Sequence, residues 1–243
     1  MTDYRSRIYN RYISARSRSI APSAIEGLNT RAPVFRKIIR EHFPSEQTAV
    51  VIDLGCGHGA FIYFIREAGY TCVKGVDRSP EQIAAAKQLG IDEVSEGGLM
   101  ETLRSLPDES QDVVISFDVI EHFTKDELLL FVDEVFRVLR KSGRWIVHAP
   151  NGESPFVGGV LYGDFTHELA FTSVSITQLL SASGFSKIRC YEDTPVPHGL
   201  KSTIRCGIWW VIRWILRFYL AVETGRGGAE RIFTQNFLTV AYK

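Results

Sequence analysis

The sequence predicts an α/β fold in which helices cover both faces of a doubly wound, mostly parallel sheet of seven strands. Two observations predict this fold. Short apolar segments typical of buried parallel strands alternate with amphipathic helical segments, and a glycine-rich turn follows the first of these strands. The 243 residues suit one medium-sized domain with extensions, and their hydrophobic content of 45% is ordinary for a globular protein.

The first 45 residues are expected to form a helical N-terminal cap, followed by the main domain over residues 46–243. Residues 34–42 carry apolar side chains at helical spacing, and Pro44 follows them. We interpret residues 1–30 as a solvated, partly helical arm, with a contact to a substrate phosphate as the less favoured alternative. The arginines of this arm are Arg5, Arg7, Arg11, Arg16 and Arg18.

The central elements are predicted from apolar patterning and capping residues. Ser79 and Pro80 have the types of an N-cap and a first helical residue, so a helix begins there. The strands are expected at residues 49–54, 71–76, 91–95, 112–117, 144–149, 185–191 and 237–242, the last two forming an antiparallel edge. Further helices are expected at residues 60–68, 125–139 and 175–183.

The longest apolar stretch, residues 204–222, lies in a predicted helical insertion over residues 203–230. It also contains Arg213 and Arg217. Each arginine costs about 2.5–3.5 kcal/mol at the centre of a bilayer, which argues against a spanning helix. We favour a helix packed in the core or closed over the active site as a lid. Contact with a membrane surface is the alternative.

Charge and cysteine usage exclude several classes of protein. Lys+Arg and Asp+Glu both number 28, and this balance argues against a nucleic-acid binder. The four cysteines form no CxxC pair and show no metal-ligand spacing, so we expect free thiols in a reducing compartment. The first residues lack the apolar run of a signal peptide, and we therefore expect a cytoplasmic protein.

The glycine-rich turn lies where a parallel sheet binds nucleotides. Gly55 and Gly57 let the backbone turn tightly and approach a ligand. Asp77 ends the next strand, where a carboxylate can bind both hydroxyls of a ribose. The turn also fits the GxGxxA pattern of dinucleotide-binding enzymes, with Ala60 as its last residue. The carboxylate of Asp53 instead favours a cationic methyl donor, as do the GxGxG spacing and the helix before the first strand.

Four segments in order resemble the successive motifs of class I S-adenosylmethionine-dependent methyltransferases. They are DLGCGHG, GVDRSPEQIAAAK, LPDESQDVVISFDVIEHF and VLRKSGRWIVHAPN, within residues 50–151. The resemblance implies a Rossmann-like methyltransferase fold with S-adenosylmethionine as the cofactor. It also implies that the methionine end, the ribose and the adenine of the donor are bound by Asp53, Gly55, Cys56, Gly57, Gly59, Asp77, Arg78, Leu99, Phe117 and Asp118.

One position departs from the family pattern. The family usually has an acidic residue after the third strand, which accepts a hydrogen bond from the adenine amino group, and here Gly98 stands there. We expect Glu96 or a backbone carbonyl to replace it.

The acceptor is expected to bind at a loop over residues 152–174. Its GDFTHE segment, followed by Phe171 and Thr172, resembles methyltransferases of bacterial surface-polysaccharide and other glycan pathways, and IFTQN at residues 232–236 is similar to the same group. His167 is the candidate general base, with Asp164 and Glu168 orienting it. A purely structural role in the loop is the alternative.

No metal site is predicted. Asp118, Glu121 and His122 form a polar cluster after the fourth strand, but their spacing matches no hard-cation motif. We interpret Glu121 and His122 as an anchor for that loop, with a divalent metal bound by the Asp, His and Glu side chains as the less favoured alternative. His148 lies in an apolar strand and is expected to be a hydrogen-bonded core histidine.

The sequence therefore predicts an O-methyltransferase that acts on a sugar hydroxyl of a glycan or of its lipid- or nucleotide-linked precursor. A small-molecule methyltransferase acting on a quinone, phenol or natural product is the alternative. A catalytically silent binding module is disfavoured by the intact Asp53, Gly55, Gly57 and Asp77. Protein or RNA methylation is the least expected, and the sequence predicts no oligomeric state.

Overall fold

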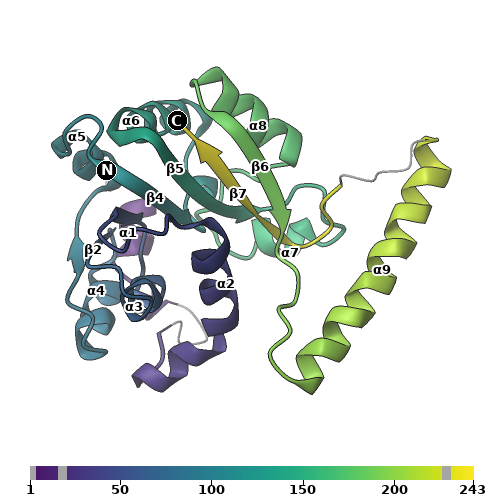
Figure 1. The fold of residues 1–243 in the computed structure, drawn as a ribbon, viewed down its shortest axis with the longest axis horizontal. Helices are drawn as coiled ribbons and strands as arrows, with labels where there is room; N and C mark the ends of the chain where they lie inside the picture. Colours follow the sequence, from purple (N-terminus) through teal and green to yellow (C-terminus); the bar gives the residue numbers. More distant parts are fainter. Residues whose placement is uncertain (1–3, 16–20, 226–230) are drawn as a thin grey trace.

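The computed structural model describes residues 4–15, 21–225 and 231–243, and it contains the predicted sheet (Figure 1). The strands are β1 (Val50–Leu54), β2 (Cys72–Asp77), β3 (Val94–Glu96), β4 (Gln111–Phe117), β5 (Leu139–Pro150), β6 (Ser186–Glu192) and β7 (Asn236–Tyr242). Their order in the sheet is β3-β2-β1-β4-β5-β7-β6. β7 runs antiparallel to both of its neighbours, while the other pairs are parallel. The mostly parallel seven-stranded sheet is confirmed.

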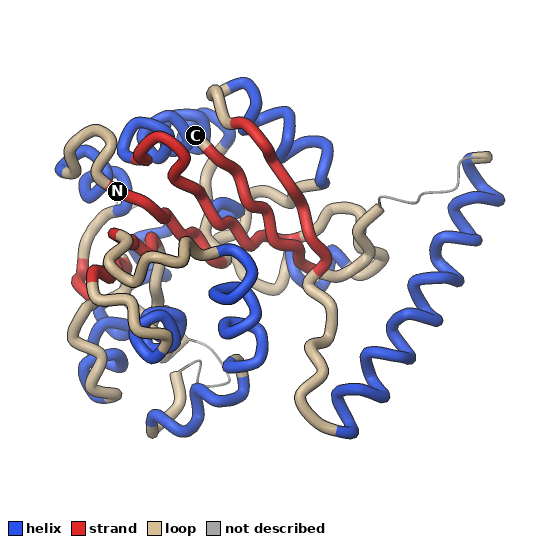
Figure 2. Tube along the Cα trace, in the orientation of Figure 1, coloured by secondary structure: helices blue, strands red, loops and turns tan. Residues whose placement is uncertain are grey.

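Helices cover both faces of this sheet (Figure 2). One face packs against α2 (Ala32–His42), α3 (Ala60–Glu67) and α4 (Pro80–Gln88) in a core that includes Phe35 and Phe61. The other face packs against α5 (Leu99–Ser105), α6 (Lys125–Val138) and α8 (Ser173–Ala182) in a core that includes Phe131 and Trp145. The remaining helices are α1 (Tyr4–Tyr9), η1 (Ile25–Thr30), η2 (Ile120–His122), α7 (Val157–Leu161) and α9 (Leu200–Thr224).

Capping and turns explain most of the element boundaries. The Ser79 side chain accepts a hydrogen bond from Gln82 N, as predicted for the N-cap of α4. β3 starts later than expected because Ile91 belongs to the buried connection before it. α5 was not predicted: it has seven residues and a single buried side chain, Leu103, which is too short a pattern to show helical periodicity.

α9 is not packed as the sequence predicted. Ser202 is its one buried residue, and it contributes no residue to the large cavity described below, so the interpretation as core or lid is wrong. The helix projects away from the sheet (Figure 1). Its link to the sheet includes the ion pair of Arg213 Nε with Glu192 Oε2 at 2.8 Å. In the described parts of the chain, no helix combines the length and the hydropathy needed to cross a bilayer. Residues 226–230 of the predicted insertion lie outside the described residues.

The order of the strands positions the functional site. The chain continues outward from β1 through β2 to β3, and then returns to place β4 on the other side of β1. In sheets of this kind, ligands bind outside the carboxyl ends of the strands at such a reversal. The loops after β1, β2 and β4 are therefore the expected walls of the site.

Candidate active site

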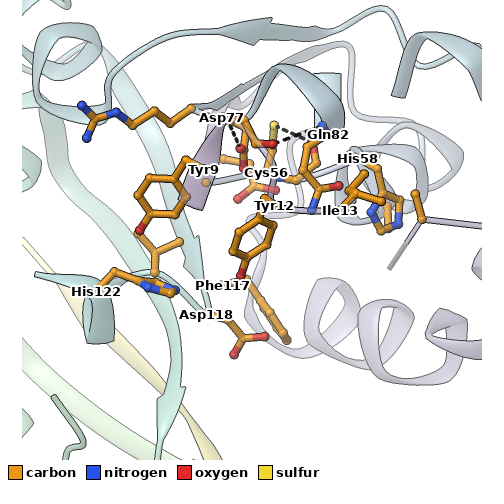
Figure 3. A pocket seen from close by; sticks show the side chains of 18 of the residues that line it. Tyr9, Tyr12, Ile13, Cys56, His58, Asp77, Gln82, Phe117, Asp118 and His122 are labelled. Atoms are coloured by element: carbon orange, nitrogen blue, oxygen red, sulfur yellow. Dashed lines mark hydrogen bonds between the residues drawn. The ribbon is translucent and has the colours of Figure 1, made fainter. Parts of the chain in front are cut away.

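A large cavity of about 1800 Å³ opens at the carboxyl ends of β1, β2 and β4. The glycine-rich turn, the loop after β4, the acceptor loop and the N-terminal segment all contribute to its wall. In Figure 3, Tyr9 and Tyr12 lie between Asp77 on one side and His122 and Asp118 on the other.

The glycine-rich turn requires glycine for two different reasons. Gly55 (φ +83°) and Gly57 (φ +56°) line the cavity in the left-handed backbone region, and a Cβ at Gly55 would lie 2.4 Å from Val119 Cγ2. Gly59 (φ +77°) lies outside the residues that line the cavity. A Cβ there would lie 2.8 Å from Ile91 Cγ2, so the structure gives Gly59 a packing role.

Asp53 is a buried carboxyl group in the wall of the cavity. It is 1% exposed, and among the described residues its Oδ1 has no hydrogen-bond partner. Burial, reinforced by the nearby charge of Asp77, raises the pKa of Asp53 to about 8. A buried, incompletely hydrogen-bonded carboxylate is stabilised by a positive charge on a ligand. This site suits the cationic methionine end of S-adenosylmethionine.

Asp77 is held rigidly at the end of β2. Its Oδ2 accepts a hydrogen bond from Gly57 N and its Oδ1 one from Ser79 N, each at 2.8 Å. Burial raises the pKa of this carboxyl group. The remaining lone pairs are available to a ribose. The other predicted cofactor-binding residues that line the cavity are Cys56, Arg78, Leu99, Phe117 and Asp118.

Asp118 is fixed by an ion pair with His148. It is a non-glycine residue at φ +58°, and its Oδ1 lies 2.5 Å from His148 Nδ1. His148 Nε2 lies 3.4 Å from Asp193 Oδ2, and the ring stacks on Phe117 at 4.0 Å. Burial lowers the pKa of His148, but the two carboxylates outweigh it and raise the pKa to about 10. The expected hydrogen-bonded core histidine is confirmed.

The two carboxylates predicted to orient His167 have other side-chain partners. Asp164 Oδ1 accepts hydrogen bonds from Thr166 N (2.9 Å) and Thr166 Oγ1 (2.6 Å), and Asp164 Oδ2 accepts one from Tyr12 Oη (2.9 Å). Glu168 accepts a hydrogen bond from the Tyr4 hydroxyl. Asp164 and Glu168 thus shape the acceptor loop and fasten it to the N-terminal segment.

The side chains beside His167 are Glu121 and His122. His167 Nε2 lies 4.0 Å from Glu121 Oε1, and the two imidazole rings are 4.7 Å apart. The Glu121 carbonyl accepts hydrogen bonds from Glu168 N (2.8 Å) and Leu169 N (3.1 Å), so this segment does anchor the loop. Its side chains, however, join His167 in the cavity wall, which the sequence interpretation did not include.

An acidic residue near Gly98 was missed by the sequence prediction. Glu96 is exposed at the end of β3, outside the residues that line the cavity, whereas Glu101 in the first turn of α5 lines it. Glu101 Oε2 lies 2.0 Å from the place that a Cβ on Gly98 would occupy. The glycine therefore makes room for this carboxylate, and finding it required knowing that a helix begins at Leu99.

The N-terminal arm covers the cavity. Tyr9, Tyr12 and Ile13 line it, and the backbone N–H groups of Ile13 and Ser14 donate to Glu81 Oε2 at 2.7 and 3.0 Å. The interpretation of this segment as a solvated arm is therefore wrong for Tyr9, Tyr12 and Ile13, which are half-buried in the cavity wall. Its partly helical character is confirmed by α1. Arg16 and Arg18 lie outside the described residues.

Comparison with known proteins agrees with this geometry. Residues 52–147 match the family model described as "Methyltransferase domain". A Mycolicibacterium smegmatis protein named "Probable S-adenosylmethionine-dependent methyltransferase" is 33% identical over 146 residues, which cover 59% of this chain and 53% of that protein. An uncharacterized methyltransferase of Schizosaccharomyces pombe is 31% identical over 47% of this chain and 45% of its own length. The match spans about half the length of these curated relatives.

Solved structures share the fold. A SAM-dependent methyltransferase from Archaeoglobus fulgidus superposes with a TM-score of 0.69 at 20% identity, covering 99% of this chain and all of that one. The Haemonchus contortus phosphoethanolamine N-methyltransferase 2, solved in complex with S-adenosylmethionine, gives 0.60 at 17% identity and covers 99% of this chain and 57% of that one. The motifs, the cavity and these matches agree with one another: residues 52–147 match a methyltransferase domain, the fold is that of solved SAM-dependent methyltransferases, and the residues that line the cavity fit S-adenosylmethionine.

Proposed function

We propose that this chain transfers the methyl group of S-adenosylmethionine to a sugar hydroxyl of a glycan or of its lipid- or nucleotide-linked precursor. The observation that carries the proposal is the group formed by Glu121, His122 and His167, which shares one cavity with Asp53 and Asp77. A hydroxyl acceptor must lose a proton during methyl transfer, and this group can take it. The resemblance of the GDFTHE loop to glycan methyltransferases supports a sugar as the acceptor.

The reaction is an in-line displacement. The acceptor oxygen forms a bond with the methyl carbon while the carbon–sulfur bond breaks, and its electron pair stays on sulfur to give S-adenosylhomocysteine. His167 Nδ1 lies 3.0 Å from the Val160 carbonyl, which can only accept a hydrogen bond, so Nδ1 carries the proton and Nε2 has the free lone pair. Nε2 is therefore our candidate base. A positioned base contributes about 10²–10⁴-fold in rate, and alignment of the reactants contributes further.

The alternative acceptor is a quinone or phenol, and one observation favours it. The aromatic side chains of Tyr9, Tyr12 and Phe117 line the cavity and suit a planar ring. One experiment distinguishes the sugar acceptor from the quinone or phenol. Methyl-labelled S-adenosylmethionine is added with the protein to an extract of the source organism, and the label is followed into its fractions. Label in glycan or lipid-linked material is expected. Label confined to the small-molecule pool would overturn the sugar assignment and favour the quinone or phenol.

We propose that Glu101 accepts the hydrogen bond from the adenine amino group. Glu101→Gln is expected to raise the dissociation constant of S-adenosylhomocysteine about tenfold, because a hydrogen bond to a charged group is worth about 1.5–3 kcal/mol. Gly98→Ala should act in the same direction, since its Cβ displaces the carboxylate. Calorimetry measures both, with the exposed Glu96→Gln as the control. Unchanged affinity in both variants would disprove the assignment.

We further propose that α9 lies on an anionic lipid surface. Ile204, Ile208, Val211, Ile215 and Val222 are more than half exposed and recur at helical spacing along its outward face. Exposed Trp210 and Trp214 are typical of the boundary between headgroups and acyl chains. Lys201 and Arg205, both exposed, add positive charge near the start of the helix.

The protein is expected to co-sediment with vesicles containing phosphatidylglycerol and to bind pure phosphatidylcholine vesicles more weakly. Replacing Ile208 and Ile215 together by aspartate should abolish co-sedimentation, because two charges would then face the acyl chains. Val174→Asp, an exposed position on α8, is the matched control. A concentration-dependent dimer without vesicle binding would instead assign this face to a second copy of the chain.

A further inference from the structure

Glu121, His122 and His167 come together from two separate loops at the cavity. One nitrogen or carboxylate oxygen from each lies within 4.8 Å of the others. Glu121 is 1% exposed, and its Oε2 has no hydrogen-bond partner among the described residues. A buried carboxylate oxygen without a partner is costly, so the arrangement calls for a group that is not part of the protein.

The contacts that each imidazole makes through its Nδ1 atom indicate which kind of group fits between them. His122 Nδ1 lies 2.9 Å from Thr166 Oγ1 and 3.3 Å from the Thr166 carbonyl. Thr166 Oγ1 already donates to Asp164 Oδ1 at 2.6 Å, so both Thr166 oxygens accept from His122. Nδ1 therefore carries the proton, and His122 Nε2 has the lone pair. His167 is fixed in the same tautomer by the Val160 carbonyl.

The two imidazoles and one buried carboxyl group thus lie together at the cavity, with His167 Nε2 4.0 Å from Glu121 Oε1. Ring nitrogens held in this way, with the other nitrogen donating to an oxygen behind it, are typical of metal-ligating histidines. Two histidines and one carboxylate suit a first-row transition metal and leave open positions for other ligands. We propose that Glu121, His122 and His167 bind a divalent transition-metal ion in the acceptor half of the cavity.

The ion gives the cavity a place to bind an acceptor oxygen. A hydroxyl bound to such an ion loses its proton to water more readily than a free hydroxyl, and the alkoxide then attacks the methyl group. In this form His167 is a ligand, and the ion replaces it as the group that ionises the acceptor. This consequence rests on the proposed hydroxyl methylation, but binding of the ion does not.

Co²⁺ titration of the metal-stripped protein tests the proposal, because the visible absorption of Co²⁺ reports nitrogen and oxygen ligands in its coordination sphere. One Co²⁺ per chain is expected. Glu121→Gln, His122→Asn and His167→Asn should each weaken Co²⁺ binding by at least about 100-fold. Thr166→Val removes a hydrogen-bond partner of His122 and should weaken it about 10- to 100-fold.

Two controls separate this result from a loss of fold or of function. His198→Asn, a histidine outside the cavity, should bind Co²⁺ like the unmodified protein. Each variant should also retain its affinity for S-adenosylhomocysteine, which shows that the sheet and the donor site are intact. Absent Co²⁺ binding, or binding unaffected by the three ligand substitutions, would overturn the metal site. That outcome would leave the proposed methylation standing, with His167 as a direct base.

Discussion

Replacing Asp53 with asparagine is expected to raise the dissociation constant of S-adenosylmethionine about 100-fold. The carboxyl group is buried in the cavity wall, its Oδ1 has no hydrogen-bond partner within the described part of the chain, and a cationic ligand would neutralise its charge. Losing one member of a buried charge pair costs about 2–5 kcal/mol in binding, a range of about 30-fold to several thousand-fold that includes this factor. Calorimetry on the purified protein measures it, with Glu96→Gln as a carboxylate control outside the cavity.

The same substitution should stabilise the ligand-free protein. Burial raises the pKa of Asp53 from its ordinary value of about 4 to about 8, so between these values the folded state holds a proton that the unfolded state releases. The free energy of unfolding therefore falls as pH rises from about 4 to about 8. Asparagine does not ionise, so the free energy of unfolding of the variant does not fall in this way. The melting temperature of Asp53→Asn should exceed that of the original protein by a few degrees at pH 8.5, and the difference should shrink towards pH 5.

Weaker binding of S-adenosylmethionine together with a higher melting temperature distinguishes this explanation from simple damage to the fold. A variant that loses affinity because its sheet is disrupted also melts earlier. If Asp53→Asn binds S-adenosylmethionine normally, the carboxylate does not contact the charged end of the donor. If it melts earlier at pH 8.5, burial does not destabilise the charged form of Asp53.

Replacing His167 with alanine is expected to lower turnover about 10²–10⁴-fold while leaving donor affinity within about twofold. The His167 imidazole lies in the cavity wall, with its Nε2 4.0 Å from Glu121 Oε1, and among the described residues it makes no hydrogen bond or ion pair with the glycine-rich turn. Turnover is measured by transfer of the methyl label into the acceptor fraction, and donor affinity by calorimetry with S-adenosylhomocysteine. His198→Ala is the matched control. Normal turnover of His167→Ala would eliminate His167 as the base, and it would show that a metal ion held by His167 is not needed for the reaction.

The donor half of the site was predictable because it is local in sequence. Asp53 lies near the end of β1, Gly55 and Gly57 follow that strand, and Asp77 ends β2, so parallel pairing alone brings them together. Glu101 was not predictable in this way. Its place depends on where a short helix begins and on the space left by Gly98.

The acceptor half depends on contacts between distant segments. His167 meets Glu121 and His122 only because the acceptor loop hydrogen-bonds to the carbonyl of Glu121, and no spacing rule encodes that contact. For α9, apolar periodicity shows that one face avoids water but does not show what covers that face. The chain's own core and an external surface leave the same pattern in the sequence.

In the sheet topology, α9 lies in a connection outside the strands whose ends form the cavity. β6 and β7 pair directly as antiparallel neighbours, and residues 193–235, α9 included, form the connection between them. A long insertion at such a surface connection costs little loop-closure entropy and leaves the strand pairing intact. The helix can therefore be lengthened, recharged or lost while the donor turn and the Glu121–His122–His167 group keep their positions. Substitutions on α9 are therefore expected to change the surface that this helix presents without changing the cavity.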